Sequence, residues 1–199
     1  MAAPARQPRP RDGAATRAKI EREALRLFAE KGVDGATIRD LAQAVGVADA
    51  ALYRYFGSKE QIASDLFRSH YGALAGKIAA IAERKLPFAQ TARELVVLFC
   101  TLFDDEPDVF AFILLNQHAH LRFVAKTGNA VEELRKIMRR AIERGEIAMT
   151  DADLAAATAL GAVLQPAVFK LYGRLPGPLR ARAEELAGAA TRAVGVKDD

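Results

Sequence analysis

Residues 37–59, TIRDLAQAVGVADAALYRYFGSK, decide the fold, because two short helical patterns meet there at one glycine. Thr37 and Asp40 have the spacing of a capping box, so we expect a helix to begin at this point. Gly46 ends that helix, since glycine adopts the backbone of a tight turn without steric cost. A second short helix is expected over residues 48–55. The stretch therefore predicts two short helices joined by a turn of three or four residues.

The residues that would face each other across this turn are small or apolar. Ala42 precedes the glycine by four positions and allows the two helices to cross closely. The inward faces would be formed by apolar residues: Leu41, Val45, Val47 and Leu52. This combination predicts a helix-turn-helix, whose second helix enters the major groove of DNA. Leu52 and Phe56 are expected to anchor that second helix in a small core, which leaves Tyr53 near the rim.

Apolar residues recur at helical spacing along almost the whole chain, and no stretch has the pattern of a strand. A first helix with a buried stripe over Ile20–Phe28 should end near Gly32. A second capping box at Ser58–Gln61 opens a long helix that reaches about Arg84. Further helices are expected at residues 88–103, 107–122, 128–144, 151–172 and 178–194.

The prediction is an all-α protein in three parts. Residues 1–13 would form a disordered basic arm, residues 14–60 an N-terminal three-helix helix-turn-helix DNA-binding domain, and residues 61–199 a C-terminal helical bundle. The formal net charge of +4 is carried by residues 1–19, which also contain three prolines. Such an arm suits a phosphate-rich partner, although a solubilising tail has the same composition.

Enzymatic and metal chemistry find little support in the residues. Cys100 is the single cysteine, which excludes an internal disulfide and fits a reducing cytoplasm, and no signal peptide is visible. The most apolar stretch, residues 154–169, is short for a membrane span. His118 and His120 lie two positions apart, so on a helix they cannot share a metal ion. With no nucleophile–base set and no phosphate loop, the sequence predicts no catalytic residue, no metal site and no cofactor.

Residues 37–60 resemble the DNA-binding signature of the tetracycline-repressor (TetR) family, and the resemblance extends through Phe28–Gly32 into the preceding helix. It covers residues 14–65, about a quarter of the chain. The resemblance implies a homodimeric transcriptional regulator, usually a repressor, whose C-terminal domain dimerises and binds a small molecule that releases DNA. The implied partners are a palindromic double-stranded operator, a second copy of the chain and an unidentified ligand, with no membrane involved.

The resemblance also assigns roles to single residues by their position. Thr37, Tyr53 and Lys59 match the family's phosphate contacts. Arg39 lies where the family often touches a base or the DNA backbone. The DNA-facing places of the recognition helix are occupied by Ala48, Asp49, Ala50, Ala51 and Tyr55.

The recognition helix departs from the family pattern in ways that leave the operator sequence open. Many members have serine in place of Ala48 and threonine in place of Ala51, so a helix cap and a hydroxyl contact are missing. Asp49 either accepts a hydrogen bond from a cytosine amine or only favours the helix N-terminus. Ala50 and Ala51 either meet thymine methyl groups or act as spacers. Tyr53 either contacts phosphate or packs at the junction with the long helix.

Two features of the C-terminal bundle suggest binding surfaces. The candidates for the lining of a small-molecule pocket are Phe99, Phe103, Phe112, Asn116 and Gln117, with core packing as the alternative for the phenylalanines. Small residues over 154–166 would let another helix approach closely. With residues 180–194 they would form half of a four-helix dimer interface, or else an ordinary core helix.

A second class of function also fits the sequence. Asp49 and the alanine-rich recognition helix are compatible with a helical small-molecule-binding or protein-interaction module whose DNA-binding domain is no longer used. A regulator should show steeply salt-dependent DNA binding with a sequence-specific component, whereas such a module should show neither.

Overall fold

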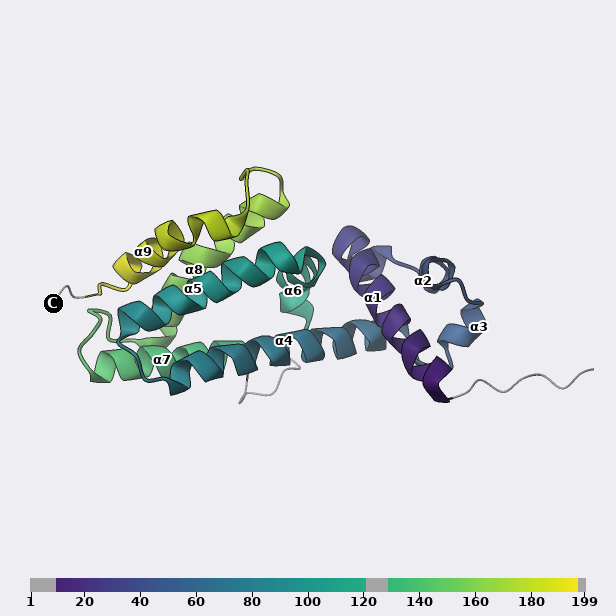
Figure 1. The fold of residues 1–199 in the computed structure, drawn as a ribbon, viewed down its shortest axis with the longest axis horizontal. Coiled ribbons are helices and arrows are strands. Elements are labelled where there is room, and N and C mark those ends of the chain that lie inside the picture. The colour runs from purple at the N-terminus through teal and green to yellow at the C-terminus, as the bar shows by residue number, and fades with distance from the viewer. Residues whose placement is uncertain (1–9, 121–128, 197–199) are drawn as a thin grey trace, which may run out of the picture. The chain divides into compact units, whose positions relative to one another are not determined.

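The computed structural model describes residues 10–120 and 129–196, and it places side chains for residues 13–114 and 129–196. These residues are mostly helical, and the described part contains one isolated bridge, between Ile147 and Val196, but no strand. The helices are α1 (Pro10–Gly35), α2 (Ile38–Val45), α3 (Asp49–Leu52), α4 (Lys59–Glu83), α5 (Phe88–Asp105), α6 (Pro107–His120), α7 (Ala130–Glu143), α8 (Ala152–Leu171), the 3-10 helix η2 (Leu179–Arg182) and α9 (Ala183–Ala193) (Figure 1). The all-α prediction is confirmed.

The chain divides into two compact units, Met1–Phe67 and Arg68–Asp199, which we call the head and the body. The boundary falls inside α4 rather than at the predicted position 60/61. Apolar residues in the first turns of α4, including Ile62 and Phe67, are buried and belong to the head. The hydrophobic core of the helix-turn-helix therefore includes more of α4 than the sequence pattern suggested.

Helix α1 forms one wall of the head. It begins at Pro10, so the predicted arm over residues 1–13 ends earlier than expected, and residues 1–9 lie outside the described part. Its fully or nearly fully buried stripe consists of Ile20, Ala24, Leu27 and Phe28. At Gly32 the backbone leaves helical geometry, with φ 73° and ψ 164°, close to the predicted end of the helix.

Helix α2 begins with the predicted capping box. The Asp40 N–H donates to Thr37 Oγ1 at 3.1 Å, and the Thr37 N–H donates to the Asp40 carboxylate at 3.0 Å. Hydrogen bonds from the Thr37 backbone and hydroxyl lower the pKa of Asp40, because they favour its charged form. The box therefore satisfies amides that a helix start otherwise leaves unpaired.

Replacing Thr37 with alanine is expected to destabilise the head by about 1 kcal/mol, because the Asp40 N–H loses its acceptor. Urea unfolding measures the change, and Thr37→Ser, which keeps the hydroxyl, is the control. The contribution of Asp40 should fade in acid: a carboxyl group with a lowered pKa stabilises the fold above its unfolded pKa and loses that effect as pH falls through its folded pKa. Equal stability of Thr37→Ala and wild type would contradict the cap.

Gly46 makes the turn between α2 and α3. Its backbone is left-handed, with φ 77° and ψ 37°. The Val47 N–H donates to the Ala42 carbonyl at 3.0 Å and the Gly46 N–H to the Gln43 carbonyl at 3.2 Å, in the pattern of a Schellman motif. A Cβ atom at Gly46 would meet no atom within 4 Å, so this position needs glycine for its φ and not for space. The predicted turn is confirmed.

Helix α3 is shorter than the predicted span of residues 48–55, because residues 53–55 form a turn. The N–H groups of Arg54 and Tyr55 donate to carbonyls three residues back, at 3.3 and 2.9 Å. Such bonds wind the chain more tightly than an α-helix does. The aromatic residues that follow α3 therefore belong to a compact corner that leads into α4.

Buried side chains and a partial capping box hold this corner. Leu52 and Phe56 are buried, as predicted for the anchors of the recognition helix. The Gln61 N–H donates to Ser58 Oγ at 3.1 Å, which confirms Ser58 as the cap of α4. The Gln61 side-chain oxygen, however, accepts from the Gly57 N–H at 3.1 Å, one residue earlier than in a standard box.

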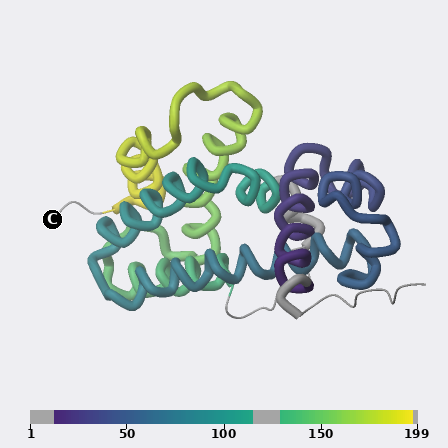
Figure 2. The backbone as a smooth tube through the Cα atoms, turned by 45° about the vertical axis from the view of Figure 1, so that its right-hand side comes forward, coloured from purple at the N-terminus to yellow at the C-terminus, as the bar shows by residue number. Residues whose placement is uncertain are grey.

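The body packs α5 against α6, α9 and η2, and α8 against α7 and α9, as the backbone paths show (Figure 2). Its core cluster includes Val96, Cys100, Phe103, Phe110, Val163, Leu179 and Leu186. The predicted helix over residues 178–194 divides into η2 and α9. Asp104 on α5 accepts the N–H groups of Leu179 and Arg180, at 2.9 and 2.8 Å, and so caps the start of η2.

Helix α8 is strongly apolar but poorly covered. Leu154 and Phe169 are 56% and 50% exposed, and Tyr172 at its end is 64% exposed. By length and composition α8 is the one helix among the described residues that could cross a membrane, and 22% of its most apolar window is buried. Packing within one chain therefore does not account for the surface of α8.

Candidate nucleic-acid interface and ligand cavity

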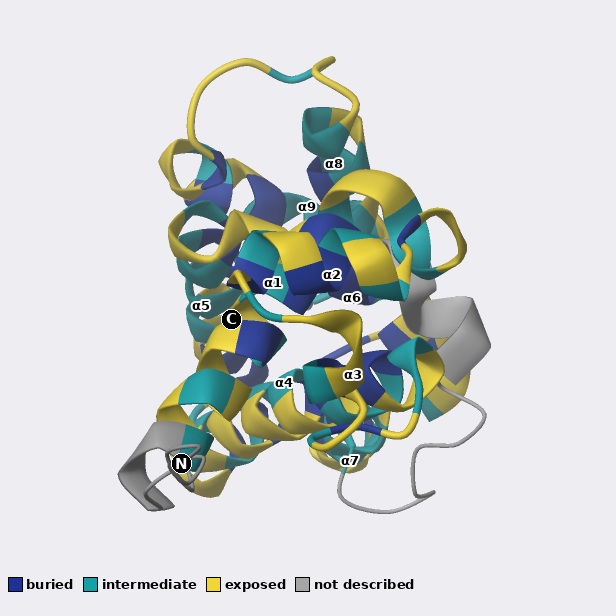
Figure 3. Cartoon of the chain, turned by 90° about the vertical axis from the view of Figure 1, so that its right-hand side faces the viewer, coloured by how far each residue is buried: buried dark blue, intermediate teal, exposed yellow. Residues whose placement is uncertain are grey.

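The predicted DNA-contacting residues lie on the surface of the head. Exposed residues are Thr37, Arg39, Ala48, Asp49, Ala50 and Tyr53, and half-buried ones are Ala51, Tyr55 and Lys59. Figure 3 shows the helices of the head coloured by burial, with exposed stretches around α2 and α3. Helix α3 packs against α2 with Leu52 buried, which directs Asp49 and Ala50 to solvent. The geometry leaves α3 accessible to a groove of DNA, and the contacts themselves stay predictions.

Helix α3 begins without a side-chain cap. Ala48 has the extended backbone of an N-cap residue, with φ −73° and ψ 149°, but makes no side-chain hydrogen bond to the helix. The loss of a cap expected from alanine at this position is confirmed. Asp49 lies in the first turn, where the helix dipole favours a negative charge. Asp49 is exposed, which is compatible with both predicted roles, a hydrogen bond to a base and stabilisation of the helix start.

Lys59 has a structural role that the sequence did not reveal. Its Nζ donates to the backbone carbonyls of Val33, Asp34 and Ala36, at 2.9, 3.2 and 3.0 Å. These carbonyls lie at the end of α1 and in its connection to α2, where a helix leaves carbonyls without intrahelical partners. An ammonium group has three N–H donors, so all of them are used. The predicted phosphate contact through this side chain would require some of these hydrogen bonds to break.

Lys19 braces the end of α2 in the same way. Its Nζ donates at 2.6 Å to the carbonyl of Val45, the last residue of α2. A cation at a helix C-terminus also interacts favourably with the helix dipole. Two lysines that the sequence presents as positive charge for DNA therefore hold the C-terminal ends of α1 and α2.

Two exposed arginines provide further positive charge on the helix-turn-helix. Arg39 on α2 and Arg54 after α3 are exposed, and neither forms an ion pair with another residue of the described structure. Sequence reasoning named Arg39 but missed Arg54. The available signal was the run Tyr53–Tyr55, in which a basic side chain stands between two that carry hydroxyl groups, all suited to phosphate oxygens.

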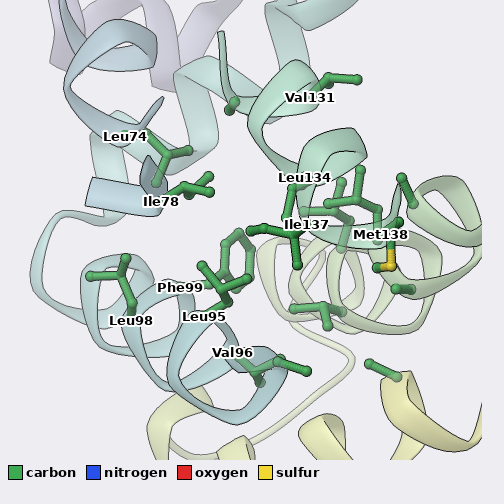
Figure 4. A pocket seen from close by; sticks show the side chains of 18 of the residues that line it. Leu74, Ile78, Leu95, Val96, Leu98, Phe99, Val131, Leu134, Ile137 and Met138 are labelled. Atoms are coloured by element: carbon green, nitrogen blue, oxygen red, sulfur yellow. The ribbon is translucent and has the colours of Figure 1, made fainter. Parts of the chain in front are cut away.

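The body contains a cavity of about 160 Å³ lined by residues of α4 to α9. Ile78 of α4, Phe99 of α5 and Ile137 of α7 point into the same space (Figure 4). Sequence reasoning missed most of this lining, because the aliphatic residues that form it have the same helical periodicity as any core residue.

The structure describes the side chains of three of the five predicted pocket residues. Phe99 lines the cavity. Phe103 and Phe112 are not among the residues that line it. Phe103 packs in the core beside Phe99, with ring centroids 6.2 Å apart, and Phe112 is completely buried. The side chains of Asn116 and Gln117 lie outside the described residues.

The described wall of the cavity carries no charged side chain, and Tyr71 is the one residue in it with a polar side chain. Burial raises the pKa of the Tyr71 hydroxyl, and a backbone hydrogen bond from Val131 offsets part of that rise. The hydroxyl is therefore protonated at neutral pH. The wall thus offers an almost purely apolar environment.

No other chemistry-bearing cluster accompanies the cavity. In the ranges that the structure describes, no group of three histidine, cysteine, aspartate or glutamate residues could hold a metal ion. Cys100 is buried, and burial raises the pKa of its thiol to about 11. The thiol is therefore neutral and poorly nucleophilic at physiological pH.

Comparison with known proteins identifies the head most directly. Residues 20–66 match the model of the bacterial regulatory proteins, tetR family. The transcriptional repressor KstR2 of Rhodococcus jostii is 37% identical over 70 residues, which are 35% of this chain and 34% of that protein. The match thus spans about a third of the length of this curated relative.

Solved structures match over nearly the whole chain. The TetR-family regulator PfmR of Thermus thermophilus superposes with a TM-score of 0.73 at 27% identity, covering 90% of this chain and 100% of PfmR. FadR of Bacillus subtilis, solved with stearoyl-CoA, superposes with a TM-score of 0.72 at 19% identity, covering 89% and 98%, and shows the shared fold alone. Since the capping box, the Gly46 turn and α3 all lie within the matched segment, the helix-turn-helix of this chain belongs to the tetR family of bacterial regulatory proteins.

Proposed function

We propose that this chain represses transcription in the cytoplasm as a homodimer that binds a palindromic operator and is released by a small molecule, without enzymatic activity. The observation that carries the proposal is the exposed helix α3, presented by the Gly46 turn with Leu52 buried beneath it. The name of the KstR2 relative, a transcriptional repressor, supports repression over activation.

DNA binding would combine positioning contacts with reading of bases. Arg39 and Arg54 supply charge for phosphate oxygens, and Tyr53, which is 57% exposed, supplies a hydroxyl group. Helix α3 presents Asp49 and Ala50, a carboxylate that can accept from a cytosine amine and a methyl group that can meet thymine. In a two-fold dimer the two recognition helices would enter the major groove about 34–36 Å apart.

A second copy of the chain is the proposed cover for α8. Leu154, Phe169 and Tyr172 expose large apolar side chains along this helix. Helix α9 packs beside α8 in the same chain, so each copy would contribute two neighbouring helices to the interface. A symmetric contact of this kind uses the same surface of both copies, which suits a palindromic site.

The cavity is the proposed ligand site. Tyr71, Leu74 and Ile78 of α4 line it, and the first turn of the same helix carries Lys59, which holds the end of α1. A ligand that binds one conformation of α4 more tightly would shift the population away from the DNA-binding form. The structurally similar FadR was solved in complex with stearoyl-CoA, which supports a ligand-binding role for this fold.

One observation favours a different class of function. Helix α3 presents a carboxylate and alanine side chains, which repel phosphate or offer it nothing. A helical binding module whose head no longer engages DNA would keep the cavity and the exposed α8, but would show no salt-dependent DNA binding.

Selection of bound fragments from a random DNA pool, followed by salt titration, separates the two functions. A repressor should enrich a palindrome and bind it with a steep decrease of log K against log salt concentration. Binding to neither the selected pool nor random DNA at low ionic strength would overturn the proposal in favour of the module.

Arg54→Gln is expected to weaken binding to the operator and to random DNA alike, and to lower the salt slope by about 0.9 for the lost phosphate contact. Arg39→Gln should weaken binding similarly and also relax preference at one base. Fluorescence anisotropy at several salt concentrations measures both effects. Arg139→Gln, an exposed change on α7 of the body, is the control. Unchanged slopes for both head variants would place the DNA-contacting surface elsewhere.

A further inference from the structure

The wall of the cavity has a chemistry that restricts what can bind inside. Apart from Tyr71 its described side chains are hydrocarbon, with one thioether from Met138. A charged group moved from water into such surroundings without a partner is strongly disfavoured. The wall therefore selects against an anion or cation and favours an uncharged ligand.

Two arginines of α7, a helix that lines the cavity, are engaged elsewhere. Arg135 pairs with Glu132 at 2.9 Å and also with Asp153. Arg140 donates to the Ala82 carbonyl at 3.2 Å. Neither arginine is among the residues that line the cavity. A carboxylate inside would thus find no cationic partner in the described part of the wall.

The tyrosine does not change this conclusion. The Tyr71 oxygen accepts a backbone hydrogen bond from Val131, and Tyr71 is 7% exposed. The Tyr71 hydroxyl oxygen on α4 is therefore already hydrogen-bonded to the backbone of α7. A ligand that depends on several hydrogen bonds would leave most of its polar groups unsatisfied in this cavity.

The size of the cavity and its aromatic residues restrict the class of ligand further. An apolar cavity of about 150 Å³ in another protein stays dry and binds benzene, and this cavity measures about 160 Å³. Phe99 and Phe110 both line it and meet edge to face, with ring centroids 5.1 Å apart at 88°. Aromatic edges and faces pack favourably against a further ring.

We propose that the cavity binds an uncharged hydrocarbon of about one ring with a short alkyl chain, and that carboxylates and phosphate-bearing thioesters of similar hydrocarbon content are excluded. This inference rests on the proposed function for its effect on DNA, but the binding itself does not. The ligand class is thus set by the absence of charge in the described wall and by a volume that fits a single ring.

The experiment compares matched probes on the full chain. Propylbenzene and 4-propylbenzoate share ring and alkyl chain and differ in one carboxylate. At pH 8, propylbenzene is expected to raise the melting temperature and to bind at least ten-fold more tightly in calorimetry than 4-propylbenzoate or octanoyl-CoA. Equal or tighter binding of either anion, or no binding of propylbenzene up to its solubility, would overturn the proposal.

Cavity-filling variants locate the binding site. Ala92→Leu adds carbon atoms to the wall from α5 and should abolish propylbenzene binding, whereas Ala89→Leu, at an exposed position of the same helix, should not. Leu134→Trp fills the cavity from α7 and is the second cavity-filling variant, to be used if Ala92→Leu does not fold. Undiminished binding by a folded filled variant would place the ligand elsewhere and overturn the proposal.

Operator binding in the presence of propylbenzene separates the two claims. If propylbenzene occupies the cavity but leaves operator affinity unchanged, the ligand inference holds and the ligand-responsive part of the proposed function fails. If the operator is bound specifically but propylbenzene does not bind, the ligand inference fails and the DNA-binding function stands.

Discussion

Replacing Lys59 with methionine is expected to weaken operator binding about 30-fold while leaving the salt dependence of binding unchanged. Methionine keeps an unbranched side chain but has no donors, so the carbonyls of Val33, Asp34 and Ala36 lose their shared ammonium partner. Hydrogen bonds to charged groups contribute about 1.5–3 kcal/mol. With partial exposure of Lys59, we expect a loss of about 2 kcal/mol in the unfolding free energy of the head. If the loosened head must regain its ordered conformation on DNA at a similar free-energy cost, the affinity for the operator falls about 30-fold.

The salt slope distinguishes this bracing role from a direct phosphate contact. Removing a lysine that neutralises a phosphate lowers the salt slope by about 0.9. Removing a lysine that only holds helix ends together lowers the affinity for operator and random DNA without changing the slope. Chemical unfolding and anisotropy titrations measure both quantities. Lys77→Met, an exposed change later in α4, is the matched control. A slope reduced by about 0.9 at unchanged stability would show that the ammonium leaves the carbonyls to bind phosphate.

A glutamate in place of Phe169 is expected to abolish dimerisation and to reduce operator affinity by about 10²–10⁴-fold. Phe169 is half exposed on α8, so the folded single chain tolerates the charge, but a symmetric interface would bring two glutamates into an apolar contact. Once the copies separate, each half-site is bound alone, and the gain from simultaneous binding is lost.

Light scattering during size exclusion reports the mass, and anisotropy on full and half operator sites reports the affinity. Circular dichroism should show unchanged helix content. Ala89→Glu, at an exposed position of α5, is the control for added charge. A Phe169→Glu protein that stays dimeric would exclude this part of α8 from the interface.

Local rules were enough to predict the helix-turn-helix. The Thr37–Asp40 box and the Gly46 turn depend on residues within a few positions of one another, so their sequence spacing already determines the hydrogen bonds. The early end of α3 was missed, because its last bonds change from the α to the 3-10 pattern at residues that are not helix breakers. The pattern of buried residues predicts a helix but not its final turn.

Tertiary partners and cavity walls were beyond the sequence. Lys59 meets carbonyls more than 20 positions away, and nothing in a local pattern distinguishes that use of a lysine from phosphate binding. Phe99 lines the cavity while Phe103, one helical turn later, fills the core. Which of two apolar residues borders an empty space depends on how well the neighbouring helices fill the volume, and periodicity carries no information on that.

The bracing by Lys19 and Lys59 has a consequence for covalent modification of the protein. Acylation of either amine would remove N–H donors as well as charge, so the modified group could no longer hold the carbonyl end of its helix. Acetyl donors would therefore loosen the framework around the recognition helix, whereas Arg39 and Arg54, which such reagents do not modify, would keep their charge. Acylation of these lysines would thus affect the head by removing hydrogen bonds that hold its helices together, rather than by removing charges that contact DNA.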